Sequence, residues 1–156
     1  MSKRSTTGRL PTTERSLPIA LIRAREKVMA PIRDMLSETG ITEQQWRVLR
    51  ILSEHPALDA TDLAERAGLH QPSLTRILKT LSEREFIHRA ADANDRRRQV
   101  VVLTDAGRQV IDDNLDQATQ IAEAILASLG QERFDTLLDL LTALDDFSFD
   151  PAALPD

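Results

Sequence analysis

Side chains suited to reading nucleic acid are concentrated between His70 and Arg98. From His70 the sequence runs HQPSLTRILKT, in which Leu74, Ile77 and Leu78 recur at spacings of three and four. That period predicts an amphipathic helix with a polar second face. Amide, hydroxyl and guanidinium groups on such a face can pair with base edges in a DNA major groove. The candidate residues are Gln71, Pro72, Ser73, Thr75, Arg76 and Lys79.

The polar side chains of this helix suit different partners. Gln71 can pair with adenine and Arg76 with guanine, whereas Ser73 and Thr75 can reach bases or phosphates. A solvated helix face without any DNA contact is the alternative for Arg76 and Lys79. The sequence leaves open which of these residues read bases.

A basic hairpin is expected directly after this helix. The turn-forming sequence DANDRRR, Asp92–Arg98, separates the apolar pair Phe86 and Ile87 from the apolar run Val100–Leu103. An ordinary charged hairpin is the alternative, but three consecutive arginines favour contact with DNA, with Arg96 and Arg98 on phosphates. Helix and hairpin together predict a winged helix-turn-helix, a mainly α fold with a small β-wing (α+β).

Length and composition support a DNA-binding regulator without cofactors. The 156 residues suit one domain and contain no cysteine, which excludes disulfides and thiolate metal sites. No apolar stretch reaches the roughly 18 residues of a membrane helix, so we expect a cytoplasmic protein with no membrane partner, no metal and no cofactor. The net charge of −5 hides an asymmetry: residues 66–103 hold 8 Lys or Arg against 4 Asp or Glu, and residues 104–156 hold 2 against 12. The middle of the chain is therefore the part that would face phosphates.

Helical periodicity and capping residues place the elements before the reading helix. Residues 1–13 are polar and aperiodic and are expected to form a disordered tail. A helix should run from Leu17 to Leu36 with Ser16 as its N-cap, and another should follow the capping-box pair Thr42 and Gln45. A short helix capped by Asp59 should end at Gly68, where the turn of the helix-turn-helix begins.

Two further helices follow the hairpin. Thr104 should cap a helix that extends to Gly130, and a last helix should run from Glu132 to about Phe147, with a flexible tail over residues 148–156. The last helix is apolar on more than one face, which predicts a homodimer formed with the help of the helix at Leu17. The expected domain covers residues 14–147, and its DNA-binding part covers about residues 42–104.

This order of elements resembles the MarR family of bacterial transcriptional regulators. The most specific match is the wing signature formed by Asp95, Arg97, the run Val102–Thr104 and Gly107, and the resemblance extends from about Ser16 to Phe147. It implies a homodimer whose two recognition helices enter successive major grooves of a pseudopalindromic operator, about 34 to 36 Å apart. It also implies that Arg97 enters the minor groove while Asp95 fixes the wing tip.

Two stretches, SLPIALIRAREKVMAPIR and GITEQQWRVLRIL, resemble the subgroup of repressors of homoprotocatechuate degradation. Gln71 stands where that subgroup is expected to have arginine. The resemblance implies release from DNA by a small aromatic acid of the 4-hydroxyphenylacetate or homoprotocatechuate type.

Arg25 is the candidate anchor for such an acid. It falls within the apolar stripe of the first helix, four residues after Leu21 and three before Val28, and a charge there needs a partner. The partner is either an acidic residue of another helix or the carboxylate of an effector held against Trp46. His70 and Ser16 are candidates to complete the second kind of site.

Three other functions are alternatives, of which an enzyme is disfavoured and the other two remain open. An enzyme is disfavoured because the three histidines, His55, His70 and His88, lack ligand spacing and no glycine-rich phosphate loop occurs. A winged helix that binds a protein partner, or a MarR-type regulator of efflux or stress response, remains open.

Overall fold

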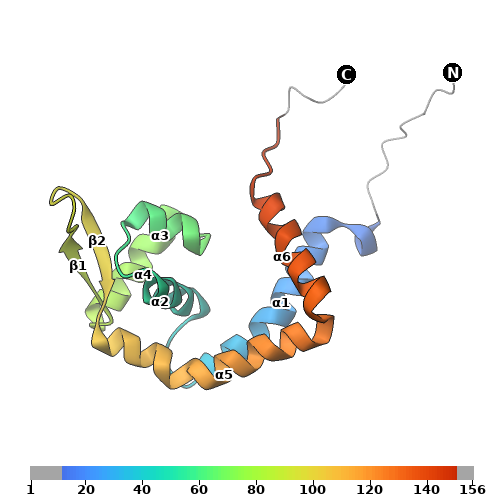
Figure 1. Ribbon diagram of the computed structural model, residues 1–156, viewed down its shortest axis with the longest axis horizontal. Coiled ribbons are helices and arrows are strands. Elements are labelled where there is room, and N and C mark those ends of the chain that lie inside the picture. The colour runs from blue at the N-terminus through green and yellow to red at the C-terminus, as the bar shows by residue number, and fades with distance from the viewer. Residues whose placement is uncertain (1–11, 151–156) are drawn as a thin grey trace. The chain divides into compact units, whose positions relative to one another are not determined.

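The computed structural model describes residues 12–150 and divides into two compact units, residues 1–116 and 117–156. Within the described residues, six α-helices accompany one two-stranded sheet, which confirms the predicted mainly helical fold with a small β-wing (Figure 1). The predicted N-terminal tail lies outside the described residues as far as residue 11. Its last residue, Thr13, belongs to a short 3-10 helix, Thr13–Arg15.

Helix α1, Leu17–Leu36, has the predicted bounds, and its N-cap is Ser16. The Ser16 side chain makes no capping hydrogen bond, so the expected capping role of its hydroxyl is wrong. Only Met35 and Leu36 of α1 are buried in the single chain. Most of α1 therefore presents its side chains to solvent or to a partner.

Helix α2, Glu43–Glu54, forms the centre of the first unit. The predicted capping box is present: the Gln45 backbone N–H donates to Thr42 Oγ1 at 3.2 Å, and the Thr42 N–H donates to Gln45 Oε1 at 3.0 Å. The apolar face of α2 is almost fully buried against α3, α4 and the hairpin; its core residues are Trp46, Val48, Leu49 and Leu52.

The helix-turn-helix consists of α3, Ala60–Ala67, and α4, Gln71–Glu83. Asp59 caps α3 by accepting the Asp62 N–H at 2.8 Å. Gly68 ends α3 with φ +59°, a left-handed conformation that glycine adopts without steric cost. The predicted cap and terminator of this short helix are therefore confirmed.

The wing is an antiparallel hairpin of β1, Ile87–Ala91, and β2, Gln99–Leu103, paired from Ile87 with Leu103 to Ala91 with Gln99. Phe86, expected in the first strand, lies outside it. A third partner was not predicted from the sequence: Leu58 forms an isolated bridge with Val101. Leu58 and Val101 are both buried, so this bridge joins the middle of β2 to the segment that leads into α3.

Helix α5, Asp105–Leu129, begins where β2 ends, and Thr104 Oγ1 accepts the Gly107 N–H at 3.0 Å as predicted. Gly107 lies so close to Phe86 that a Cβ atom would overlap the Phe86 carbonyl oxygen and crowd the Leu103 side chain. The start of α5 can therefore pack against the wing only with glycine at this position.

The second unit contains the end of α5 and helix α6, Gln131–Asp145. Helix α6 ends two residues before the predicted Phe147 and has no buried residue in the single chain. Among the described residues, no helix is long and apolar enough to cross a membrane.

We expect Gly107→Ala to lower the free energy of unfolding by about 3 kcal/mol, because the backbone carbonyl of Phe86 cannot move aside as a flexible side chain could. Urea unfolding measures this change. Ala106→Ser, at the exposed neighbouring position, is the control and should stay within about 0.5 kcal/mol of the wild type. Equal stabilities of the two variants would contradict the close packing of α5 on Phe86.

Candidate nucleic-acid interface

The turn between α3 and α4 is fixed by hydrogen bonds from both sides. The Leu69 N–H donates to the Ala64 carbonyl at 2.9 Å, and the Arg47 guanidinium of α2 donates to the Ala67 carbonyl at 2.7 Å. These contacts satisfy carbonyls that the end of α3 would otherwise leave unpaired. The direction of α4 is therefore set by α2 and α3 together.

Helix α4 is anchored by one face and open on the other. Its buried residues are Leu74, Ile77, Leu78 and Leu81. Ser73 is half-buried, and the remaining candidate DNA contacts are exposed: Gln71, Pro72, Thr75, Arg76 and Lys79.

Several polar groups of the open face remain available to a ligand. Thr75 uses its hydroxyl hydrogen on the Gln71 carbonyl at 2.9 Å, so its oxygen can still accept. Lys79 lies 3.9 Å from Glu83, one turn on, in an exposed pair of a kind that contributes little to stability. The Arg76 side chain makes no hydrogen bond or ion pair with any described residue, and it borders an open groove of about 350 Å³ with Gln44, Gln45, Ser73, Ile77 and Thr80.

The tip of the wing is built by two aspartates. Asp92 accepts the backbone N–H groups of Asn94 and Asp95 at 2.7 and 3.2 Å, and Asp95 accepts that of Arg97 at 3.0 Å. Carboxylates that bind the backbone two or three residues on stabilise tight turns. The geometry agrees with the prediction that Asp95 fixes the tip.

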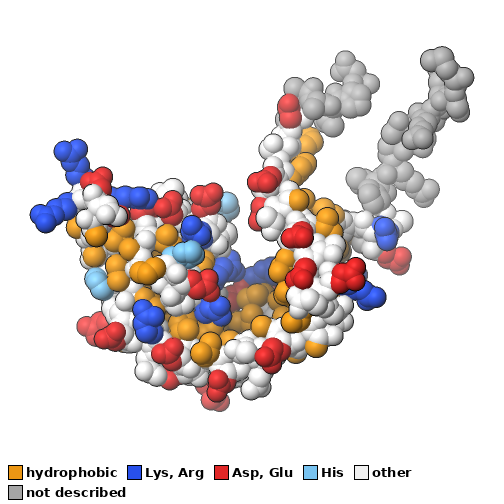
Figure 2. Space-filling view, in the orientation of Figure 1, with side chains coloured by type: hydrophobic (Ala, Val, Ile, Leu, Met, Phe, Trp, Pro, Cys, Tyr) orange, Lys and Arg blue, Asp and Glu red, His pale blue; other side chains and the backbone are white. Residues whose placement is uncertain are grey.

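The three arginines of the tip differ in their surroundings. Arg96 and Arg97 are exposed, and their side chains contact no acidic group of the described chain. Lys and Arg side chains project from the wing tip in Figure 2. Arg98 instead forms ion pairs with Asp59 and Asp62 of the α3 N-terminus. Arg98 was expected to contact a phosphate, but in the structure its guanidinium already has two carboxylate partners.

The junction between α4 and the wing contacts the turn that follows α1. Arg84, directly after α4, donates to the carbonyls of Gly40 at 2.7 Å and Thr39 at 3.4 Å. Its guanidinium carbon also lies 4.6 Å from the centre of the Phe86 ring, a cation–π distance. One side chain therefore joins the α1–α2 turn to the recognition helix and the wing.

Arg25, the candidate effector anchor, has the interhelical partner that the sequence left as one alternative. It forms ion pairs with Glu43 of α2 and, at 3.2 Å, with Glu26, and Arg33 binds the second Glu43 oxygen at 3.1 Å. The Arg25 side chain is 49% exposed and that of Glu43 is 16% exposed. Burial disfavours the Glu43 carboxylate, but the hydrogen bonds from Arg33 and Arg25 outweigh it and lower the pKa of Glu43.

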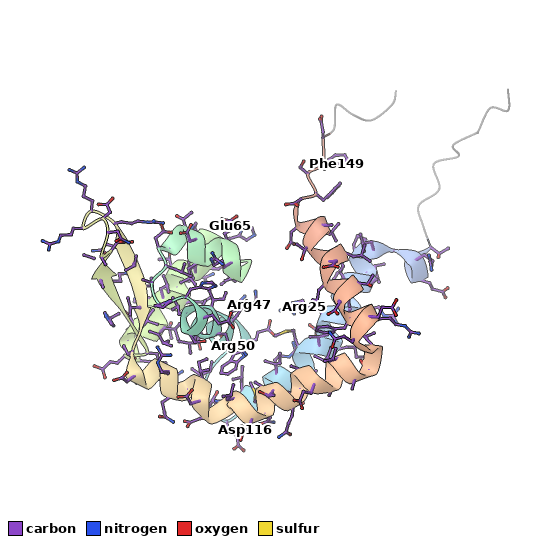
Figure 3. All side chains as sticks on the ribbon, in the orientation of Figure 1. Arg25, Arg47, Arg50, Glu65, Asp116 and Phe149 are labelled. Carbon is purple, nitrogen blue, oxygen red and sulfur yellow. The ribbon has the colours of Figure 1, made fainter. Side chains whose placement is uncertain are left out.

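Three side chains of α2 lie on the face that meets Arg25. Glu43, Trp46 and Arg50 are spaced by three and four residues and therefore share one side of the helix. Trp46 is 6% exposed, whereas Arg50 is half exposed and pairs with Glu54 of its own helix at 3.1 Å. Figure 3 shows Arg25 on α1 and Arg47 and Arg50 on α2. The sequence analysis missed Arg50 and Arg33, although the spacing of Arg50 from Trp46 could have identified it.

Of the other two candidate effector residues, Ser16 is not brought to Arg25 within one chain, and no hydrogen bond or ion pair among the described residues joins His70 to Arg25. Ser16 lies nine residues before Arg25, about 14 Å along the axis of α1. His70 is the N-cap residue of α4 and makes no side-chain capping bond. Ser16 can therefore reach such a site only from a second copy of the chain.

An anchored recognition helix followed by a hairpin with exposed arginines defines a winged helix-turn-helix protein of the DNA-binding class. Residues 41–98 match the model of the MarR family. With this match and close relatives over most of its length, the chain belongs to the MarR family of transcriptional regulators.

Two named relatives and one solved structure illustrate the similarity. The HTH-type transcriptional regulator FarR of Neisseria gonorrhoeae is 39% identical over 83% of this chain and 88% of its own length. The homoprotocatechuate degradative operon repressor of Escherichia coli is 37% identical over 81% of this chain and 85% of its own. The crystal structure of NadR in complex with 4-hydroxyphenylacetate is 37% identical, covers 89% of this chain and all of that chain, and has a TM-score of 0.77. The two relatives named first are a transcriptional regulator and an operon repressor.

We expect Arg97→Ala to weaken binding to a duplex selected from random DNA by the wild-type protein. The binding free energy should fall by about 1 to 3 kcal/mol, because the substitution removes the guanidinium expected to enter the minor groove. Fluorescence anisotropy at fixed salt measures the affinity, and sedimentation shows whether the oligomeric state is preserved. Binding within twofold of the wild type would contradict a DNA contact by the wing.

Lys79→Ala serves as the comparison for a phosphate contact. It should weaken binding to all sequences alike and reduce the slope of log K against log salt by about 1.

Proposed function

We propose that this chain is a ligand-responsive repressor, which binds a pseudopalindromic operator as a homodimer and leaves it when a small aromatic carboxylate binds. The observation that carries the proposal is the similarity, at 37% identity in both cases, to a repressor of a homoprotocatechuate degradative operon and to NadR crystallised with 4-hydroxyphenylacetate. Homoprotocatechuate and 4-hydroxyphenylacetate are both hydroxylated phenylacetates, in which a methylene group joins the carboxylate to the aromatic ring. The effector proposed for this chain has the same chemistry.

Exposed apolar side chains support the homodimer. Helix α1 exposes Leu17, Leu21, Ile22 and Val28, and α6 exposes Leu137, Leu138, Leu140 and Leu141, followed by Phe147. Several large apolar side chains exposed on one helix, as on each of these two, favour burial against a partner. A second copy supplies the same surfaces in a closed twofold interface.

Three arginines of α1 and α2 support a carboxylate effector. Arg25 and Arg33 pair with Glu26 and Glu43, and Arg50, on the α2 face that carries Glu43 and Trp46, pairs with Glu54. An open groove of about 470 Å³ is bordered by Arg33, Leu36, Ser37, Gly40, Ile41, Thr42 and Glu43. An acid that binds Arg25 has to compete with Glu43, whereas Arg50 pairs with the exposed Glu54. Arg25 is the proposed anchor, Arg50 is a second candidate, and Trp46 and His70 are the proposed neighbours, with Ser16 supplied by the second protomer.

We expect 4-hydroxyphenylacetate, homoprotocatechuate or a hydroxycinnamate to weaken operator binding by at least tenfold at saturation, a coupling free energy of about 1.4 kcal/mol. Anisotropy with the selected duplex measures this change. 4-Hydroxyphenylethanol, which has the ring without the carboxylate, is the control and should have no effect.

Two variants locate the anchor. Arg25→Ala or Arg50→Ala should abolish the response to the acid while leaving binding to the free operator within a few-fold of the wild type. If no aromatic carboxylate changes the affinity of the wild type, Arg25 is a structural residue and the effector proposal is wrong.

The dimer is tested separately. Leu137→Glu should produce monomers at micromolar concentration, because it places a charge within the exposed apolar face of α6. Asp139→Gln, on the opposite side of the same helix, should remain dimeric. Sedimentation velocity measures both, and a dimeric Leu137→Glu variant would contradict the participation of α6.

A further inference from the structure

We propose that Arg98 is a positioning residue of the wing: it holds the hairpin to the N-terminus of α3 through Asp59 and Asp62, and thereby fixes where the exposed Arg96 and Arg97 meet DNA. The proposal rests on the DNA contact proposed above for the wing. It also separates Arg98 from Arg96, which the sequence analysis had grouped with it as a phosphate contact.

The contact is multidentate and involves a helix cap. Arg98 donates from Nε and Nη2 to one oxygen of Asp59, at 2.7 Å from Nε, and from Nη2 to Asp62 at 3.0 Å. The other oxygen of Asp59 accepts the Asp62 N–H and caps α3. One carboxylate therefore both begins the helix and holds the wing. The Asp62 N–H first, and then Arg98, lower the pKa of Asp59, so this group is ionised at neutral pH.

The backbone around Arg98 shows what the contact restrains. In the middle of β2, Val101 donates to the Leu58 carbonyl at 2.7 Å. Arg98 lies three residues closer to the tip, just beyond the last strand pair of Ala91 with Gln99. Its own N–H and carbonyl close the tip turn with Asp95 and Asp92 at 2.9 and 2.8 Å.

A two-stranded hairpin is flexible unless it packs on another element. The Leu58 bridge fixes the middle of β2 and leaves the tip turn beyond Gln99 without a backbone contact to α3. Among the contacts of the described chain, the Arg98 ion pairs are those that hold the outer part of the wing to α3. Without them the tip would be free to swing relative to α4.

A phosphate contact would require different surroundings. A guanidinium bound to two carboxylates has most of its charge compensated locally, and moving it to a phosphate would leave Asp59 and Asp62 unpaired near DNA. Arg96 and Arg97 face no such competition. Arg96 and Arg97 therefore supply the positive charge that contacts DNA, and Arg98 fixes the position of the wing tip that carries them.

The first test compares salt dependence and side-chain identity. Arg98→Ala should weaken binding to the selected duplex by about five- to thirtyfold with an unchanged slope of log K against log salt, whereas loss of a phosphate contact lowers the slope by about 1. Arg98→Lys should bind the duplex as weakly as Arg98→Ala, because the lysine ammonium group cannot bridge two carboxylates as the planar guanidinium of arginine does. A lowered slope, or full affinity with lysine, would overturn the proposal.

The second test removes the two carboxylates that bind Arg98 and keeps the N-cap of α3. Asn is a good N-cap residue, so Asp59→Asn with Asp62→Asn removes the ion pairs without removing the cap of α3. In this background Arg98→Ala should cause no further loss of affinity, while Arg97→Ala should still cause its full loss. An undiminished effect of Arg98→Ala in this background would show that Arg98 acts on DNA directly.

A measurement without DNA separates this proposal from the proposed function. Arg98→Ala should increase amide hydrogen exchange across residues 92–98, with exchange in α4 and the midpoint of urea unfolding unchanged; unchanged exchange at the tip would overturn the restraint. If the wild-type protein selects no duplex, the DNA-binding proposal itself is wrong, and the positioning role for DNA contact fails with it.

Discussion

The burial of one face of α4 is the interaction on which the DNA-reading surface depends. Leu74 and Leu81 are completely buried, and Ile77 and Leu78 nearly so. Rotating α4 about its axis would expose these side chains, at a cost of about 1.5 to 3 kcal/mol each. The direction of the polar side chains on the opposite face is therefore set by this burial, and their hydrogen bonds and ion pair stay within α4 itself. These side chains remain available to a ligand for the same reason.

Charge in the first unit is arranged so that only part of it is available to phosphates. Arg25, Arg33 and Arg98 are paired with carboxylates of the same unit, whereas Arg76, Arg96 and Arg97 have no acidic partner among the described residues. A count of basic residues over the segment treats these two groups as equal. The structure separates arginines that organise the protein from arginines that can meet DNA.

Local signals explain which features could be predicted from the sequence. Capping by Thr42, Asp59 and Thr104 depends on residues three positions apart, and apolar periodicity shows which face of α4 is buried. The partners of Arg98 and the bridge from Leu58 to Val101 lie more than 35 residues away along the chain, where no spacing rule applies. Arg25 is an intermediate case: its position within an apolar stripe indicated a need for a partner, but could not decide between Glu43 and a ligand. The ends of β1 and α6 were misplaced by one or two residues, where local preferences are weak.

The contacts of Arg84 have a consequence for how the reading head can move. This side chain holds the turn after α1 by its carbonyls and stacks on Phe86, which lies between α4 and β1. A rotation of α1 would therefore act on the recognition helix and the wing at their common junction, and both would turn together. In the proposed dimer, such a rotation would leave the proposed DNA contacts of each protomer unchanged. It would alter the distance between the two recognition helices, and binding to a duplex of fixed helical pitch depends on that distance.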